Sequence, residues 1–462
     1  MLPEASAQPA LDAPRDTVAV ALTPAIQRAL DVSPEVNQRQ AQVRFAEARH
    51  AEARASRFFT DFQLSTAHSL APSLDIPSSN QKSFDELYLN PDVRNDWADL
   101  RPFNRFAVDA TQPIYTWGEL SQSIEAAERG VEVEEAGTAQ KALEVAFRTG
   151  EIYYNVLLTN ALFRLTDETG SAINRAKREV QRLLDEGAED VDQADLFKVR
   201  LTEQEYRRRV VEITQRRQTA RTALRRQLFY PEGTTLHPTA DDLRPIAFPI
   251  PPDSLDHFVS MALRNRPELA QAEAGVAARS ALVNVARSGY YPKLGLQATY
   301  AVSYTPDRFR QKNAFIGEPY IGQSTRTGIG IQQNLNFFQT RARVEQARAE
   351  LNEVRYQQEA AQQLIRFEVE DAYRNVLIAE TDVASRDEDV TLTEEWLRTE
   401  QINFDLDIGN TENLIEAVQA NLTAKASYYQ AVQRYNTAVL KLLRTTGVLA
   451  RRAKAGMLLD TQ

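Results

Sequence analysis

An internal repeat is the feature that most constrains the fold of this chain. Four short patterns occur twice in the same order, at offsets between 220 and 233 residues. The paired segments are residues 26–35 and 259–268, 58–64 and 290–296, 153–157 and 373–377, and Gly187 and Gly409. Self-similarity of this kind predicts two copies of one structural unit. We expect a first repeat at 20–230, a Pro-rich linker and equatorial region at 231–253, and a second repeat at 254–447.

The composition removes several classes of function. The chain of 462 residues has no cysteine, four histidines and a net charge of −10. Disulfides, thiolate metal sites and cysteine nucleophiles are therefore excluded, and no two histidines stand at the spacing of metal ligands. The acidic balance argues against nucleic acid as a partner. No nucleophile–base pair or phosphate-binding loop is visible, so we expect no enzyme activity, no cofactor and no metal.

The two ends of the chain carry little pattern. Residues 1–19 are rich in Ala and Pro, which predicts a flexible segment, and residues 448–462 form a C-terminal tail. Ala5-Ser6-Ala7 also fits the cleavage site of a secretory signal peptide, although no apolar stretch precedes it. The sequence leaves both interpretations open, a flexible tail and a signal-peptide remnant.

Two segments in each half alternate as β-strands do, at about 58–68 and 104–115 and at about 293–304 and 327–337. In residues 294–304 every even position is apolar and every odd position is small or polar. No apolar run approaches the roughly 18–20 residues of a membrane-spanning helix, which excludes a helical membrane protein. A soluble β-sandwich would alternate in the same way, but the strand lengths and the aromatic residues near the strand ends favour a membrane β-barrel. Long polar loops at 71–103 and 305–324 would join the strands of each pair.

The remainder of each half is predicted to be helical. One helix precedes each strand pair, and a long helical hairpin follows it. Proline is absent from 114–230 and from residue 320 to the end, and heptad-like apolar spacing runs through both stretches. The expected helices are 118–186 and 338–408, each about 100 Å long at 1.5 Å per residue, with return helices at about 191–229 and 411–446. Gly187 and Gly409 would reverse the chain between them.

Four strands cannot close a barrel, and open strand edges cannot remain in lipid. The chain must therefore share its barrel with copies of itself, most simply around a cyclic axis. Two copies would give eight strands and three copies twelve, both within the range of membrane barrels. An eight-stranded barrel is filled by side chains. The small and polar residues expected on the inner face fit a water-filled pore better, which favours three or more copies.

The pattern resembles the TolC-type outer-membrane efflux family over residues 20–447. The resemblance rests on the repeated order of helix, strands and long hairpin, together with several short motifs. These motifs are Tyr291-Pro292-Lys293-Leu294 at a strand entry, the segment Gln-Pro-Ile-Tyr-Thr-Trp-Gly at 112–118 at a strand exit, its degenerate partner at 333–337, the glycine turns, and the helix from Glu416-Ala417 to Tyr435.

The resemblance implies an α+β membrane protein. Four strands per protomer would join a trimeric 12-stranded outer-membrane β-barrel, and the coiled-coil helices would form a periplasmic α-barrel. Such a homotrimer sits in the outer membrane of a Gram-negative cell, in contact with outer-membrane lipid, and extends into the periplasm. It passively conducts substrates received from a periplasmic adaptor (membrane fusion) protein and an inner-membrane pump or ABC transporter, in efflux or in type I secretion.

The resemblance also suggests functional residues at the hairpin ends. The family's best-known member has two aspartates after the second hairpin turn, at the periplasmic entrance. The matching positions here are Asn413 and Glu416, with Asp195 as the first-half counterpart, so the entrance ring is expected to be weaker. Leu406 stands where a gate tyrosine is expected. Gly187 and Gly409 mark hairpin tips for adaptor docking. The acidic tip comprises Asp190, Asp192, Asp407 and Glu412, which form either solvated hairpin ends or a cation-attracting mouth.

The main alternative is a soluble or periplasmic coiled-coil scaffold without channel activity. A scaffold explains the long helices but not four alternating strands with aromatic ends and long polar loops. The transported substrate stays open, although three methionines and the lack of cysteine weigh against soft-metal export.

Overall fold

The computed structural model describes residues 17–58, 61–75, 94–186, 192–240, 242–251, 254–308, 318–406 and 411–458. It divides into two compact units, which we call the helical unit (1–43, 134–271 and 357–462) and the sheet unit (44–133 and 272–356). Each unit takes segments from both halves of the chain. The compact units therefore cut across the predicted repeats at 20–230 and 254–447.

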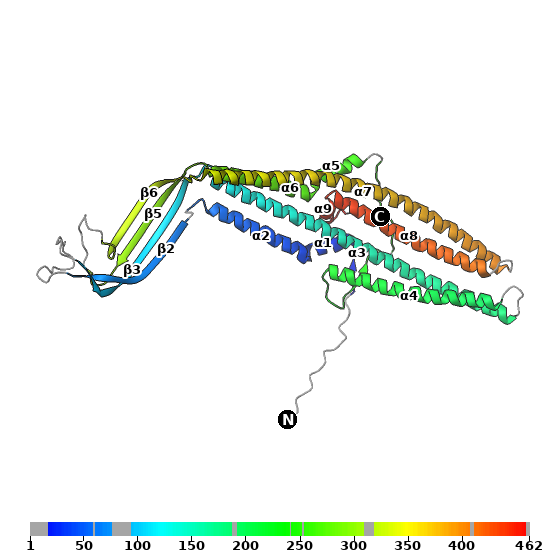
Figure 1. The fold of residues 1–462 in the computed structure, drawn as a ribbon. Coiled ribbons are helices and arrows are strands. Elements are labelled where there is room, and N and C mark those ends of the chain that lie inside the picture. The colour runs from blue at the N-terminus through cyan, green and yellow to red at the C-terminus, as the bar shows by residue number, and fades with distance from the viewer. Residues whose placement is uncertain are drawn as a thin grey trace, which may run out of the picture. The chain divides into compact units, whose positions relative to one another are not determined.

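The described elements alternate short helix, strand pair and long helix (Figure 1). In chain order they are β1 (Thr17–Val20), α1 (Leu22–Val32), α2 (Pro34–Ala55), β2 (Asp61–Asp75), β3 (Arg94–Tyr115), α3 (Glu119–Glu186), α4 (Gln193–Gln227), β4 (Thr235–Pro238), α5 (Leu255–Asn265), α6 (Pro267–Ser288), β5 (Lys293–Tyr304), β6 (Gly322–Gln332), α7 (Phe337–Asp405), α8 (Thr411–Thr445) and α9 (Leu449–Lys454).

A break in the first helix of each half corrects the prediction of one helix before each strand pair. The chain forms α1 and α2 instead of one helix, and α5 and α6 in the second half. Ser33 and Arg266 each precede a proline and have extended backbone, with ψ of 121° and 122°. The proline ring disfavours helical backbone in the residue before it, while proline itself is well placed in the first turn of the next helix.

The sheet unit contains a four-stranded antiparallel sheet in the order β2-β3-β5-β6 (Figure 1). Strand β5 occupies the predicted range, but the other three differ. β2 and β3 extend into the two ends of the predicted polar loop as a paired ribbon, with Ala71 opposite Arg101 and a register shift after Pro72. Pro72 is tolerated because β2 lies at the edge of the sheet. Strand β6 ends at Gln332 because an Asx turn follows, in which Asn334 Oδ1 accepts from the Asn336 N–H at 2.9 Å.

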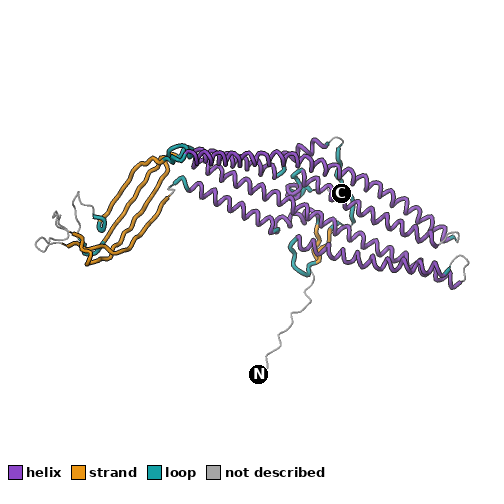
Figure 2. Tube along the Cα trace, viewed as in Figure 1, coloured by secondary structure: helices purple, strands orange, loops and turns teal. Residues whose placement is uncertain are grey.

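The helical unit packs around a large apolar core, to which α1, α3, α4, α8 and α9 contribute. The short parallel pair β1–β4 lies among these helices (Figure 2). The linker is held in place by Asn436, which is fully buried on α8. Its side-chain amide accepts from the Ile246 N–H and donates to the Arg244 carbonyl, both at 2.9 Å. A buried amide with both groups satisfied fixes the Pro-rich linker at one register.

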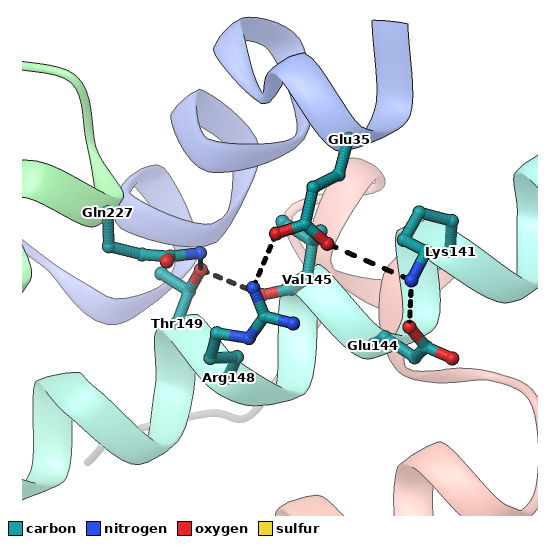
Figure 3. Close-up of polar contacts among 7 residues, drawn as sticks. All are labelled: Glu35, Lys141, Glu144, Val145, Arg148, Thr149 and Gln227. Atoms are coloured by element: carbon teal, nitrogen blue, oxygen red, sulfur yellow. Dashed lines mark hydrogen bonds and ion pairs between the residues drawn. The ribbon is translucent and has the colours of Figure 1, made fainter. Parts of the chain in front are cut away.

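Polar contacts join the start of α2 to the middle of α3 (Figure 3). Arg148 Nη1 donates to Glu35 Oε1 at 2.6 Å, and Lys141 Nζ lies 3.8 Å from the other Glu35 oxygen. The hydrogen bond from Arg148, with the charges of Arg148 and Lys141, lowers the pKa of Glu35. Glu35 also stands in the first turn of α2, where a negative charge is favourable. These contacts fix the point at which α2 meets α3.

The C-terminal region is more ordered than a tail. Helix α9 buries Leu449 and Ala453, and the turn before it contains Gly447 with φ +76°. The N–H groups of Gly447 and Val448 donate to the carbonyls of Arg444 and Leu443, which is the pattern of a Schellman cap. Within the described residues, no helix combines the length and apolar character needed to cross a membrane.

Candidate channel-forming surfaces

The strand register gathers large apolar side chains on one face of the sheet. Successive residues of a strand point to opposite faces, so every second residue shares a face with its cross-strand partner. The apolar face comprises Phe62, Leu64, Phe106, Val108, Leu294, Leu296, Tyr300, Val302, Ile329 and Ile331. Phe62 is 71% exposed and Ile331 is 74% exposed. An exposed and mainly apolar surface of this kind marks contact with a membrane or with another protein.

The opposite face of the same sheet is polar. It carries Asp61, Gln63, Ser65, Arg105, Asp109, Thr111, Gln297, Thr299, Ser303, Ser324 and Arg326, with Gly328 and Gly330 near one end. Thr299 Oγ1 donates to Asp109 Oδ1 at 2.7 Å between neighbouring strands. One sheet therefore presents an apolar side and a water-compatible side, as the alternation in the sequence predicts.

The two outer strands of the sheet each have a partner on one side within the described residues. β2 pairs with β3, and β6 pairs with β5. Each outer strand therefore carries a row of backbone N–H and C=O groups that can pair with another strand. In an apolar environment such groups have to be paired, because water is not there to satisfy them.

Aromatic side chains cluster where β3 ends and β5 begins. Trp117 stacks on Tyr291 with ring centroids 4.8 Å apart, and Tyr115 lies edge-on to Trp117 at 5.0 Å. The indole Nε1 of Trp117 donates to the Pro292 carbonyl at 2.7 Å. Amphipathic aromatic rings are typical of the boundary between lipid and water. We call Tyr115, Trp117 and Tyr291 the aromatic cluster.

A buried charge cluster lies at the other end of the strands. Arg308 and Glu318 pair at 3.0 Å, with only 2% and 8% of their side chains exposed. The Arg308 guanidinium also donates to Asn95 Oδ1 at 2.8 Å and to the Pro72 carbonyl, and it lies over the Tyr320 ring. These contacts connect the segments that flank β5 and β6 to the ends of β2 and β3. Sequence reasoning missed them, because the segment looks like an ordinary polar loop.

The ends of the long helices meet in a small core of the helical unit. Val180 of α3 packs with Leu196 and Val199 of α4, and Ile415 of α8 joins them. Lys198 of α4 then connects the two hairpins, since its Nζ lies 3.2 Å from Glu412 of α8 and 3.7 Å from Asp195. The hydrogen bond and charge of Glu412, with the charge of Asp195, raise the pKa of Lys198. The acidic residues at this end thus have a cationic partner, Lys198, that sequence periodicity does not reveal.

Two of the predicted site residues cap a helix. Asp192 is the N-cap of α4, and its Oδ1 accepts from the N–H groups of Ala194 and Asp195 at 2.7 and 3.1 Å. Asp195 Oδ2 accepts in return from the Asp192 N–H at 3.2 Å, which completes a capping box. The spacing Asp-x-x-Asp at the helix start is a signal that could have predicted this role from sequence. Both carboxylates are therefore engaged in local structure, beside the ion pair of Asp195 with Lys198.

The remaining predicted residues differ in their surroundings. Glu416 is exposed on α8 and forms no ion pair within the described part of the chain. Asn413 lies one turn before it and is also exposed, and Leu406 is exposed just after α7. Gly187, Asp190, Asp407 and Gly409 lie outside the described residues. Among the described residues, no group of three or more His, Cys, Asp or Glu side chains is arranged to hold a metal ion.

Comparison with solved structures shows the same fold. The outer-membrane channel OprN matches with a TM-score of 0.72 and 17% identity, over 92% of this chain and 89% of that one. The CmeC outer membrane channel of Campylobacter jejuni matches with a TM-score of 0.73 and 15% identity, over 100% of this chain and 94% of that one. The open state of the Neisseria gonorrhoeae MtrE outer membrane channel matches with a TM-score of 0.72 and 14% identity, over 96% of this chain and 90% of that one.

Part of the chain matches a known family in sequence. No curated protein sequence matches the chain. Residues 258–448, however, match the model of the outer membrane efflux protein family, and no enzyme family is indicated. This segment covers α5 to α8, including two strands of the sheet and the second long hairpin. Residues 258–448 are therefore similar to the outer membrane efflux protein family, and nearly all of the chain has the fold of solved outer-membrane channels.

Proposed function

We propose that this chain is one protomer of a trimeric export duct in the outer membrane of a Gram-negative cell. The observation that carries the proposal is the four-stranded sheet, which has one apolar face, one polar face and an outer strand on each side. Pairing β6 of one copy with β2 of the next would satisfy both rows of backbone groups. The apolar face would then contact lipid, and the polar face would line a water-filled pore.

Three copies fit the polar face better than two. Three sheets give a twelve-stranded barrel, and two give eight strands, whose interior side chains would fill the space. The polar face carries Gly328 and Gly330 on β6 and charged residues on β3, including Arg105 and Asp109. Small and charged side chains suit an aqueous lumen. The same order of short helices, two strands and a long hairpin in both halves supports the twofold internal repeat.

The long hairpins would continue the duct into the periplasm. We propose that their ends dock a periplasmic adaptor, with Gly187 and Gly409 in the turns and Asp190, Asp192, Asp407 and Glu412 as the acidic tip. An inner-membrane pump or ABC transporter would supply the energy, in efflux or in type I secretion. The chain itself would conduct passively. Asp195, Asn413 and Glu416 would lie at the periplasmic entrance, where threefold repetition concentrates charge.

Planar lipid bilayer recordings test the proposed function. The purified full-length chain is expected to produce uniform stepwise conductance increments after it is added from detergent. A coiled-coil scaffold would leave the bilayer current unchanged at every protein concentration. The mass of the detergent-solubilised protein, corrected for bound detergent, is expected to equal three chains. A monomer without conductance would contradict the proposal and favour the scaffold.

Changing Glu416 to Gln is expected to reduce the preference of the channel for cations. Glu416 carries its charge without an ion pair in the described part of the chain, whereas Glu412 shares Lys198 with Asp195. Removing three symmetry-related charges should therefore shift the reversal potential in a salt gradient towards zero, most strongly at low ionic strength. Glu205→Gln is the matched control, because Glu205 is paired with Arg209 at 2.7 Å on α4. Equal shifts in both variants would contradict a role for Glu416.

A further inference from the structure

A pocket of about 340 Å³ lies between α6 and α7 in the sheet unit. Its lining includes buried Val283 and Leu351, and exposed Arg287 of α6 with Arg348, Asn352 and Arg355 of α7. The two helices run side by side in Figure 1, α6 towards β5 and α7 away from β6. An antiparallel pair of this kind brings arginines that are about 60 residues apart in sequence to one pocket.

The charge of this pocket is unbalanced. Arg348 is paired with Glu345 on its own helix at 2.8 Å. Arg287 and Arg355 form no ion pair within the described residues, and the pocket lining contains no carboxylate. Guanidinium groups that line one pocket, next to buried apolar side chains, repel one another unless an anion lies between them. Their planar donor groups match phosphate oxygens in pairs, and the Asn352 amide supplies a further donor.

The residues that line the pocket lie close in sequence to the aromatic cluster and to the start of α7. Arg287 is the last residue but one of α6, and Tyr291 follows four residues later, two residues before β5. Arg348 stands eleven residues after Phe337, the first residue of α7, or about 16 Å along the helix. If the aromatic cluster marks the membrane boundary, as the proposed function requires, Arg287 lies close to that boundary on the side of the long helices, where lipid headgroups are found.

We propose that this pocket binds a phosphate-bearing anion, either the headgroup of an anionic phospholipid or a free phosphate. The lipid source rests on the proposed function, whereas the anion site itself does not. A volume of about 340 Å³ is large enough for a glycerophosphate group. The arginines would hold its phosphate, and Val283 and Leu351 would contact the apolar part of the ligand.

Binding to the purified full-length chain in detergent tests this proposal. Native mass spectrometry would measure retention of phosphatidylglycerol and of phosphatidylcholine, and calorimetry would measure binding of inorganic phosphate. We compare the wild type with Arg287→Gln/Arg355→Gln. The control Arg279→Gln/Arg341→Gln removes the same charge from the same helices outside the pocket. Anion binding is expected to weaken at least about tenfold in the pocket variant and to remain unchanged in the control.

The outcomes separate the two sources of the anion. If the pocket variant loses phosphatidylglycerol that the wild type retains, the result supports the lipid headgroup. If the wild type retains no lipid and the pocket variant loses only the binding of inorganic phosphate, the result supports the free anion. Equal binding by the pocket variant and the control would overturn the proposal, and equal retention of phosphatidylcholine and phosphatidylglycerol would overturn its lipid source. A wild-type chain that conducts but binds neither anion refutes the pocket alone. A chain that binds inorganic phosphate but never conducts refutes the proposed function alone.

Discussion

Replacing Arg308 with methionine is expected to loosen the ends of the strands at the buried charge cluster. The variant leaves Glu318 buried without its partner, and it removes the donors to Asn95 and to the Pro72 carbonyl. Breaking a buried ion pair from one side costs about 3–5 kcal/mol. Hydrogen exchange of the backbone amides in residues 94–100 should therefore accelerate by at least about a hundredfold, because local opening becomes easier.

Two further variants distinguish this explanation from general loosening of the loops. Arg101→Met removes an arginine from the neighbouring ion pair with Asp99, whose two side chains are 40% and 42% exposed. That exposed pair contributes little to stability, so the exchange rates should change only slightly. Arg308→Met/Glu318→Leu removes both buried charges and should recover much of the protection. Similar exchange rates for Arg308→Met and Arg101→Met would show that the buried pair does not hold the strand ends.

Replacing Gly447 with alanine is expected to destabilise the helical unit by about 3 kcal/mol or more. Gly447 has φ +76°, a conformation that costs roughly 1–2 kcal/mol for a residue with a Cβ. A Cβ there would also lie 2.5 Å from the Asn265 carbonyl oxygen and 3.0 Å from the Arg266 N. Both contacts are with backbone, so the turn before α9 would have to move. The midpoint of urea unfolding, monitored by circular dichroism, would measure the loss.

Gly456→Ala is the control for the close contact. Gly456 has nearly the same backbone angle, φ +73°, but nothing lies within 4 Å of the place a Cβ would take. Its substitution should show the conformational cost alone, about 1–2 kcal/mol. If the two alanine variants unfold at the same urea concentration, the approach of Gly447 to Asn265 contributes nothing to stability.

The alternation and the proline-free stretches predict much of the fold because each depends on local periodicity. Strand β5 is found at Lys293–Tyr304, and the long helices end close to the expected turns. The shift of β6 has a local cause as well. Residues 333–337 alternate like a strand, yet the Asn334 side chain forms a turn that starts α7. Alternation alone cannot distinguish these two outcomes.

Contacts between distant segments account for what the sequence did not reveal. The extension of β2 and β3 depends on pairing between residues such as Ala71 and Arg101, and neither face of that ribbon has an apolar pattern to signal it. Lys198 and Glu412 are on different hairpins, and Arg308, which follows β5, donates to Asn95 of the neighbouring strand β3. The periodicity of one helix or loop does not predict contacts between residues of different elements. The family resemblance pointed to the hairpin ends but not to the cation between them.

The central claim is that identical copies complete the sheet by pairing β6 with β2. The chain has no cysteine, so engineered cysteine pairs report this contact without background. One cysteine would replace Ser65 on β2. The second would be placed in turn at Ser324, Arg326, Gly328 or Gly330, which lie on the same face of β6. A disulfide forms only where the two Cβ atoms approach within about 3.5–4.5 Å.

Oxidation of the native protein is expected to produce covalent trimers from at least one pair, with no larger species, because a ring of three has no free edge. Ser65→Cys with Thr299→Cys is the control, since Thr299 lies on interior strand β5 and should give no bond between chains. The measurement is the mass of the crosslinked species under denaturing conditions. A ladder that stops at two chains, a ladder that continues beyond three, or the absence of crosslinks at every β6 position would contradict the account.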